Sequence, residues 1–371
     1  MEYAFLCQKQ RLERSKVSLL PLKAYNPDMM NISRRSIIGG TGASLAALMF
    51  PRHGLAQEPH KPPRLRQGDT VGLIAPASSD DEPLHLEFAR QNILGMGLVP
   101  KLGRHVADRY GYLSGTDEDR AADINAMFED DTVRAIFAIR GGWGSARLLP
   151  LLDWDLIRSR PKLLIGSSDV TALHLALAAR VGYASIHAPN VGNRWGEVSW
   201  NSLWRLAFTG ETPILGEGDG SGAGRDRPRI TTIRGGKASG PLIGGNLTIL
   251  STLMGTPWLP DFTGAILFLE DVGEAEYRID RMMNQLALAG VLKRVAGVVF
   301  GQCARCHSDV PDYAGFTIPD ILSQYLLPLG VPVFSGANIG HVSNQLSIPV
   351  GANVEMDADA GTIRLLQPIV S

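Results

Sequence analysis

The sequence predicts an α/β protein whose first folded domain is built on a parallel β-sheet. In this part of the chain, short apolar runs alternate with segments in which apolar residues recur at helical spacing. Several of the apolar runs end directly in proline, glycine or serine, as buried strands do before a turn. Strands that alternate with helices favour a parallel sheet with crossover helices, so we place this domain at residues 66–200.

The individual elements follow from these patterns. The first strand is expected at 71–75, because the apolar run Val-Gly-Leu-Ile-Ala is ended by Pro76. Thr116 is a candidate N-cap for a helix, with Asp119 three residues further on. The remaining expected elements of this domain are strands at 98–100, 133–139 and 162–166, and helices at 84–94, 117–128, 146–152 and 170–179.

A second domain is expected at residues 236–371. It is preceded by a linker at 201–235, because glycines with scattered charges at 215–236 offer nothing that could form a core. The expected elements of the second domain are helices at 246–254 and 277–289, strands at 265–269 and 295–300, and antiparallel strands from residue 346 onward.

Residues 1–56 are interpreted as a leader that carries an export signal. Arg34 and Arg35 precede an apolar stretch at 37–50, and the small residues of 54–56 suit a signal peptidase. The apolar stretch is too short to span a bilayer. We therefore expect export by the twin-arginine route to the periplasm, cleavage after Ala56, and no stable membrane insertion of the mature protein.

Composition excludes several classes of protein. The formal net charge is −1, so no basic excess indicates nucleic acid as a partner. Three cysteines do not make a disulfide scaffold.

The segment from Cys303 to His307 spells the C-x-x-C-H haem attachment motif, although no obvious axial methionine accompanies it. We interpret the motif as a chance match in a strand and loop; a disulfide or a metal site at Cys303 and Cys306 is the next alternative, and haem ranks below both.

Ser145 is the first candidate for a nucleophile. It follows the glycine-rich turn Arg140-Gly-Gly-Trp-Gly, which lies between an expected strand and an expected helix. Glycines allow a tight turn that can expose a serine, and amides at the start of the next helix can stabilise an oxyanion. The backbone amides of Gly142 and Ala146 are the candidate oxyanion donors. A structural N-cap serine is the alternative role for Ser145.

A nucleophilic serine needs a base. His341 lies in the polar segment Ile-Gly-His-Val-Ser-Asn-Gln, a plausible place for an exposed imidazole. His174 falls on the apolar face of a helix and is expected to be packed in the core, whereas His187 could be either.

The base in turn needs an orienting acid. Glu270 ends an apolar strand, where a carboxylate can be held half buried at a cleft. Asp271 and Glu274 are competing acids nearby.

Six segments, taken together and in order, resemble the LD-carboxypeptidase family, the muramoyltetrapeptide carboxypeptidase group of serine peptidases. The resemblance extends from about residue 66 to the end of the chain. The segments are Ile-Ala-Pro-Ala-Ser (74–78), Arg-Gly-Gly-Trp-Gly-Ser-Ala-Arg-Leu-Leu-Pro (140–150), Ile-Gly-Ser-Ser-Asp (165–169), Gly-Gly-Asn-Leu (244–247), Leu-Glu-Asp-Val (269–272) and Gly-His-Val-Ser-Asn-Gln-Leu (340–346).

The resemblance implies a Rossmann-like N-terminal domain, a C-terminal swivelling β/α domain, and a Ser–Glu–His triad made of Ser145, Glu270 and His341. It also implies a homodimer without metal or cofactor. The implied substrate is a murein tetrapeptide, from which the enzyme releases the terminal D-alanine by cleaving an L,D peptide bond. The export signal departs from the many relatives that work in the cytoplasm.

Two points stay open at the level of sequence. Arg140, Arg147 and Arg194 are equally available to hold the terminal carboxylate of a substrate. The alternative functions are a peptidase of the microcin-immunity type, which would keep the triad and change the pocket, and a periplasmic binding protein without catalysis.

Overall fold

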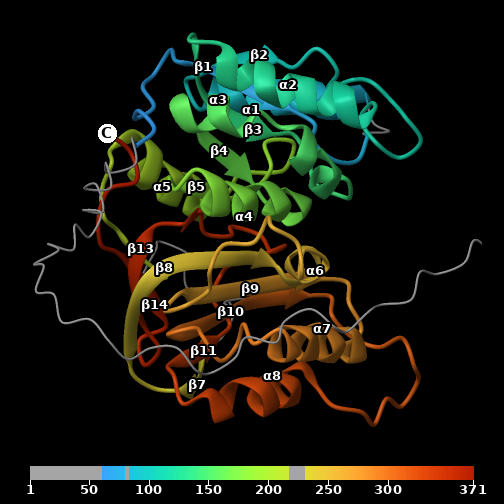
Figure 1. The fold of residues 1–371 in the computed structure, drawn as a ribbon, viewed down its shortest axis with the longest axis vertical. Coiled ribbons are helices and arrows are strands. Elements are labelled where there is room, and N and C mark those ends of the chain that lie inside the picture. Colours follow the sequence, from blue (N-terminus) through green and yellow to red (C-terminus); the bar gives the residue numbers. More distant parts are fainter. Residues whose placement is uncertain (1–60, 80–82, 217–229) are drawn as a thin grey trace, which may run out of the picture. The chain divides into compact units, whose positions relative to one another are not determined.

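A computed structural model describes residues 61–79, 83–216 and 230–371, and it confirms the predicted α/β class (Figure 1). Two β-sheets form its framework, one of six strands and one of eight. The twin-arginine leader lies outside the described residues. No helix in the described part of the chain is both long enough and apolar enough to cross a bilayer.

The first sheet has the strand order β12-β5-β4-β3-β1-β2. Its strands are β1 (Thr70–Ile74), β2 (Val99–Leu102), β3 (Val133–Ala138), β4 (Leu163–Gly166), β5 (Ser185–His187) and β12 (Ile348–Val350). β1 to β5 are parallel, as the alternation with helices predicts. β12 pairs antiparallel with β5, so a segment from near the C-terminus completes this sheet.

Helices connect the parallel strands: α1 (Pro83–Gly95), α2 (Asp117–Glu129), α3 (Trp154–Ser159) and α4 (Thr171–Arg180). Thr116 caps α2 in a capping box with Asp119, as predicted. The helix expected at 146–152 is instead a 3₁₀ helix, Ser145–Leu151. It contains Pro150, which has no N–H to donate and so prevents a regular α-helix there.

The second sheet has the order β6-β14-β13-β8-β9-β10-β11-β7. Its central strands β8 to β11 are parallel and the outer strands are antiparallel. In Figure 1, α7 (Glu276–Leu288) and α8 (Ile318–Leu326) lie beside its parallel strands, and α6 (Leu247–Thr252) follows β8. The strands are β6 (Ile214–Leu215), β7 (Thr231–Arg234), β8 (Lys237–Asn246), β9 (Ile266–Val272), β10 (Gly297–Ala304), β11 (Val333–Ser335), β13 (Asn353–Asp357) and β14 (Thr362–Leu365).

The first part of the range 201–235, which we expected to be a linker, contains regular structure. Helix α5 (Glu197–Leu203) and a π-helical turn (Trp204–Phe208) bury apolar side chains in the first part of this range, and β6 follows them. These side chains provide the burial that holds the segment in a regular structure. The glycine-rich residues 217–229 lie outside the described part of the chain.

Strand β8 of the second sheet contacts the start of helix α4 of the first domain. Gly244 and Gly245 have positive φ angles, and a Cβ on Gly245 would lie 2.5 Å from Oγ1 of Thr171 at the start of α4. The backbone N–H of Asn246, the residue after Gly245, donates a hydrogen bond to Oγ1 of Thr171 at 3.0 Å. This contact brings the end of β9, which carries Glu270, toward the start of α4.

Candidate active site

Glu270 and His341 form a hydrogen-bonded pair. Nδ1 of His341 lies 2.8 Å from Oε2 of Glu270. The carboxylate is fully buried at the end of β9, whereas the imidazole is partly exposed. The sequence predicts both residues as partners, and the structure brings them together although 71 positions separate them in the chain.

Gly340 permits this close approach. Its φ angle is +113°, and a Cβ at this position would lie 2.7 Å from Oε2 of Glu270. Any side chain at residue 340 would therefore push the His341 loop away from the carboxylate.

The electrostatics of the pair favour an ionised carboxylate beside a basic imidazole. Burial by itself would raise the pKa of Glu270, but the hydrogen bond from His341 and its charge lower that pKa below the ordinary value. Burial would likewise lower the pKa of His341, but the hydrogen bond to Glu270 and its negative charge raise it. An imidazole with a raised pKa is a stronger base, as a general base requires.

The competing acids have other partners. Asp271 accepts hydrogen bonds from Asn246 Nδ2 at 3.1 Å and from the backbone N–H of Thr248 at 2.9 Å, so it holds the start of α6. Glu274 pairs with Arg278 on α7. Glu270 is thus the acid that engages the histidine.

His341 opens onto a cleft of about 830 Å³. Loops that follow β3, β4, β5 and β11 line this cleft, together with one residue of α1. Its described lining residues are His85, Arg140, Gly141, Gly142, Ser167, Ser168, Pro189, Asn190, Asn193, Arg194, His341, Val342, Ser343, Asn344 and Gln345.

Ser168 is the serine that the sequence analysis missed. It sits where β4 ends and a short 3₁₀ turn leads into α4, and it is partly exposed in the same cleft as His341. Its φ angle is +64°, in the left-handed region that non-glycine residues rarely adopt. A strained serine on a sharp strand-to-helix turn is the arrangement by which α/β hydrolases expose a nucleophile.

Neighbouring residues hold this turn closely. A Cβ on Gly141 would lie 2.9 Å from Cβ of Ser168, so glycine is needed for the loop after β3 to reach the turn. Asn190 supports the turn from the other side, accepting a hydrogen bond from the backbone N–H of Ser167 at 3.0 Å.

Ser145, the predicted nucleophile, does not belong to this cleft. Its side chain is fully buried, and the residue is absent from the lining of the cleft. Its backbone N–H donates to Oδ2 of Asp169 at 2.7 Å, which ties the glycine-rich loop to the residue after Ser168. Ser145 therefore supports the turn through its backbone N–H. The prediction that Ser145 is the nucleophile does not fit this burial, and we propose Ser168 in its place.

Of the two predicted oxyanion donors, one lies at the cleft and the other does not. Gly142 lines the cleft, whereas Ala146, which follows the buried Ser145, does not. The backbone N–H of Asp169, the residue after Ser168, takes the place of Ala146 as a candidate donor, by the geometry usual for a strand-to-helix nucleophile turn.

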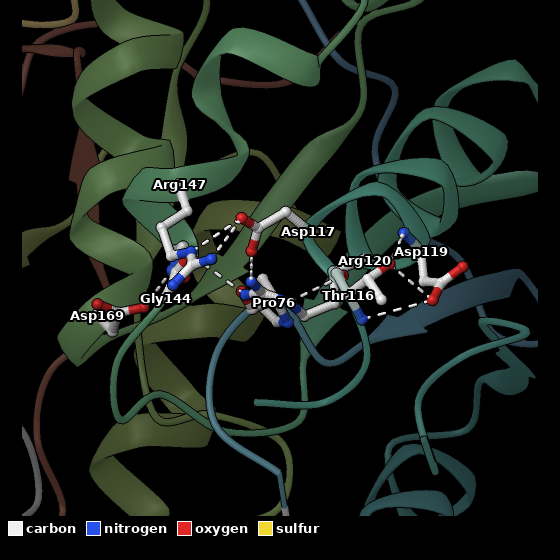
Figure 2. A network of polar contacts seen from close by, with 9 residues as sticks. Pro76, Thr116, Asp117, Asp119, Arg120, Gly144, Arg147 and Asp169 are labelled. Carbon is white, nitrogen blue, oxygen red and sulfur yellow. Dashed lines mark hydrogen bonds and ion pairs between the residues drawn. The ribbon is translucent and has the colours of Figure 1, made fainter. Parts of the chain in front are cut away.

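A buried arginine anchors the glycine-rich loop (Figure 2). The side chain of Arg120 is buried beneath the loop, and its Nη1 donates to the carbonyl oxygens of Pro76 and Gly144. Its Nη2 pairs with Asp117, which also binds Arg147 at 2.8 Å. Arg147 is thus engaged in this network and is absent from the lining of the cleft.

Replacing Arg120 by methionine is expected to lower the free energy of unfolding by about 3 kcal/mol, because buried carbonyl acceptors lose a charged donor. Urea denaturation of the purified variant measures this loss. Arg90→Met is the matched control, since Arg90 forms an exposed pair with Glu87, and such pairs contribute about 1 kcal/mol or less. Equal losses in the two variants would contradict the anchoring role.

The other candidate histidines are packed in the core. His174 is buried on α4 and bonds Ser185 Oγ at 2.8 Å and the carbonyl of Gly166 at 2.9 Å, which confirms its predicted core role. His187 is buried against Phe268, and burial lowers its pKa to about 4, so it is neutral.

Two further groups were candidates for cofactor or metal chemistry. Cys303 and Cys306 form a disulfide, so neither thiol is available to attach haem. His105, Asp108 and Asp119 have ligand atoms within 4.8 Å of one another. These side chains already find partners in the protein, because His105 pairs with Asp108 and Asp119 closes the capping box of α2.

The fold and the cleft define an α/β protein in which a serine on a strained turn and a histidine paired to a buried carboxylate line one cleft. Comparison with known proteins identifies it further. The family model described as LD-carboxypeptidase N-terminal domain matches residues 71–188, and that described as LD-carboxypeptidase C-terminal domain matches residues 239–356. The chain belongs to the LD-carboxypeptidase family and is a carboxypeptidase.

Individual relatives agree with this membership. A probable murein peptide carboxypeptidase of Bacillus subtilis is 36% identical over 273 residues, 74% of this chain and 84% of that protein. A murein tetrapeptide carboxypeptidase of Pseudomonas aeruginosa is 35% identical over 272 residues, 71% and 85% of the two chains. The solved structure of the microcin C7 self-immunity protein MccF superposes with a TM-score of 0.75 at 23% identity, covering 84% of this chain and all of that one, which shows a shared fold.

Proposed function

We propose that this protein is a serine carboxypeptidase that removes the terminal D-alanine of murein tetrapeptides by hydrolysing an L,D peptide bond. The observation that carries the proposal is the single cleft lined by Ser168, on its strained turn, and by His341, which is paired to Glu270. Relatives named for murein peptides and tetrapeptides, at 35–36% identity, support the substrate class.

In the proposed mechanism, His341 removes the proton from Oγ of Ser168 as that oxygen attacks the carbonyl carbon of the L-centred residue. Because Nδ1 of His341 engages Glu270, Nε2 is the nitrogen that acts on the serine. Glu270 orients the ring and stabilises its cationic form. His341 then protonates the leaving amine and D-alanine departs. Water next attacks the acyl carbon while His341 takes its proton, and His341 passes that proton to Oγ of Ser168 as the ester bond breaks and the tripeptide leaves.

The tetrahedral intermediate carries a negative oxygen that needs donors. We assign this role to the backbone N–H groups of Asp169 and Gly142, which lie next to Ser168 and in the lining of the cleft, respectively. Donors fixed in place stabilise developing charge at no cost of reorganisation.

The pH dependence of kcat/KM is expected to have an acid limb with its midpoint above 6.5, the ordinary pKa of histidine. His341 must be neutral to accept a proton, and Glu270 raises its pKa, so activity falls as pH drops through this raised value. Glu270→Gln should move the midpoint to lower pH, because the imidazole of His341 then loses the negative charge that raises its pKa. A midpoint that Glu270→Gln leaves in place would contradict the assignment of Glu270.

The experiment that tests the reaction is a mass-spectrometric assay with the tetrapeptide ending in meso-diaminopimelate–D-alanine. The purified protein should release one D-alanine and leave the tripeptide intact. A protein that leaves the tetrapeptide unchanged while reacting with a serine-directed phosphonate would retain the triad and require another amide substrate, as in the microcin-immunity alternative. A protein that does neither would be the binding protein.

We propose further that the protein acts after export, on periplasmic murein peptides, since Arg34 and Arg35 precede the apolar stretch at 37–50. Replacing both arginines by lysine should retain the full chain in the cytoplasm when cell fractions are probed with an antibody. Export that is unaffected would contradict the twin-arginine route.

The homodimer stays a prediction, which light scattering of the purified protein checks.

A further inference from the structure

Arginine side chains line the cleft that also contains the proposed reacting groups. Arg140 and Arg194 both line it, and no aspartate or glutamate is among its described lining residues. Arg147, the third arginine that the sequence offers, is paired with Asp117 and lies outside the cleft lining. A guanidinium group at a cleft can bind an anionic group of a ligand.

The two arginines of the cleft differ in their partners. Arg140 donates through Nη1 to the carbonyl oxygen of Ser79 at 2.9 Å. Arg194 is exposed and has no hydrogen bond or ion pair with any of the residues that the structure describes. Its guanidinium group is therefore available to a ligand.

The backbone that carries Arg194 is held in place from two sides. The N–H groups of Val191 and Gly192 donate at 2.9 Å to the carbonyls of Ala138 and Ile139, directly before Arg140. Nδ2 of Asn92 donates to the carbonyls of Val191, at 2.6 Å, and of Asn193, at 2.9 Å. A side chain on such a fixed segment loses less freedom on binding than one on a mobile loop.

The same segment packs against the loop of the catalytic histidine. A Cβ on Gly196 would lie 1.5 Å from Oδ1 of Asn344, so the backbone at 196 touches the segment three residues after His341. Arg194 therefore lies two residues from this contact and lines the same cleft as Ser168 and His341.

We propose that Arg194 binds a carboxylate of the substrate next to the reacting bond, and so restricts the enzyme to peptides that carry this free carboxylate. This inference rests on the proposed function. A guanidinium group matches a carboxylate in two parallel hydrogen bonds, which a lysine cannot reproduce. Two carboxylates of the tetrapeptide are within the scope of the proposal: that of the terminal D-alanine, and the side-chain carboxylate of the preceding diaminopimelate.

The test compares four peptides with wild type, Arg194→Gln and Arg194→Lys. The peptides end in D-alanine or D-alaninamide, and the preceding residue is diaminopimelate or lysine, which lacks the side-chain carboxylate. Arg134→Gln is the matched control, an exposed arginine on β3 outside the cleft lining. The readouts are kcat and KM for release of the terminal residue.

Arg194→Gln is expected to lower kcat/KM for the tetrapeptide roughly 10- to 100-fold, mainly through KM, since a charge-assisted hydrogen bond is lost. Arg194→Lys should recover part of this loss. The loss should vanish for the amide if Arg194 binds the terminal carboxylate, or for the lysine peptide if it binds the side-chain carboxylate, and either pattern supports the proposal. Equal losses for all four peptides, or no loss, would overturn it.

A binding arm separates this inference from the proposed reaction. Calorimetry with Ser168→Ala protein measures affinity for the same peptides without turnover. If the wild-type protein releases no D-alanine, the reaction is wrong. The carboxylate site still stands if Ser168→Ala binds the acid peptides and the Ser168→Ala/Arg194→Gln double variant binds them roughly 10- to 100-fold more weakly. Equal binding by the two proteins, or no binding by either, overturns the site.

Discussion

Ser168→Ala is expected to lower the rate of D-alanine release by about 10⁴-fold or more, because the reaction loses its nucleophile. Ser145→Ala should leave the rate largely unchanged. The Ser145 hydroxyl is buried away from the cleft, and its link to Asp169 runs through the backbone N–H, which alanine retains. The two variants are a matched pair, since each removes one hydroxyl after a glycine-containing turn.

Steady-state release of D-alanine, followed by mass spectrometry, measures both rates. Thermal unfolding of the two variants controls for damage to the fold. Ser145→Ala is the variant more prone to such damage, because the side chain of Ser145 is buried. A dead Ser145→Ala protein that is folded, together with an active Ser168→Ala protein, would restore the nucleophile to Ser145.

The second large effect is expected at the histidine–carboxylate pair. His341→Ala should cost as much as Ser168→Ala, and the double variant should be no slower than either single one, because the two groups act as a unit. Glu270→Gln should lower kcat by about 10³- to 10⁴-fold, since an amide cannot stabilise the imidazolium ion. Glu274→Gln is the control, a nearby acid that pairs with Arg278.

Stopped-flow or quenched assays at saturating tetrapeptide give kcat for this series. Losses that multiply in the Ser168→Ala/His341→Ala double variant would show that the two residues act independently. That result would remove His341 from the role of base, even if each single variant is slow.

The parts of the fold that sequence could predict are those with a clear apolar period. Strand β3 and helix α2 could be predicted from the pattern of apolar residues in their sequences, and the capping box at Thr116 marks where α2 begins. Strand β8 could not be recognised in this way, because its glycines resemble a loop. These glycines are required by close approach, since a Cβ on Gly244 would lie 1.8 Å from the carbonyl oxygen of Phe268 on β9.

The residues of the candidate site also differ in how far the sequence alone could identify them. The sequence made Glu270 and His341 candidates, because Glu270 follows an apolar run and His341 lies in a polar segment. The family resemblance, and not this pattern, separated Glu270 from Asp271 and Glu274. The nucleophile could not be chosen by local pattern, since Ser145 and Ser168 both follow a strand and a glycine-containing turn. What separates them is burial and the positive φ of Ser168, and both depend on tertiary packing around the turn. The sequence signal that could have helped is Gly166-Ser-Ser-Asp169, which places a serine directly between β4 and α4.

The most direct test of the central claim is peptide mapping after labelling with a serine-directed phosphonate, with and without the murein tetrapeptide. Trypsin places the two serines in different fragments, Ser145 in 141–147 and Ser168 in 163–180. We predict a single adduct on Ser168, located by fragmentation within the second peptide, and slower labelling when the tetrapeptide is present. An adduct on Ser145, or labelling of Ser168 that the tetrapeptide does not slow, would contradict the account.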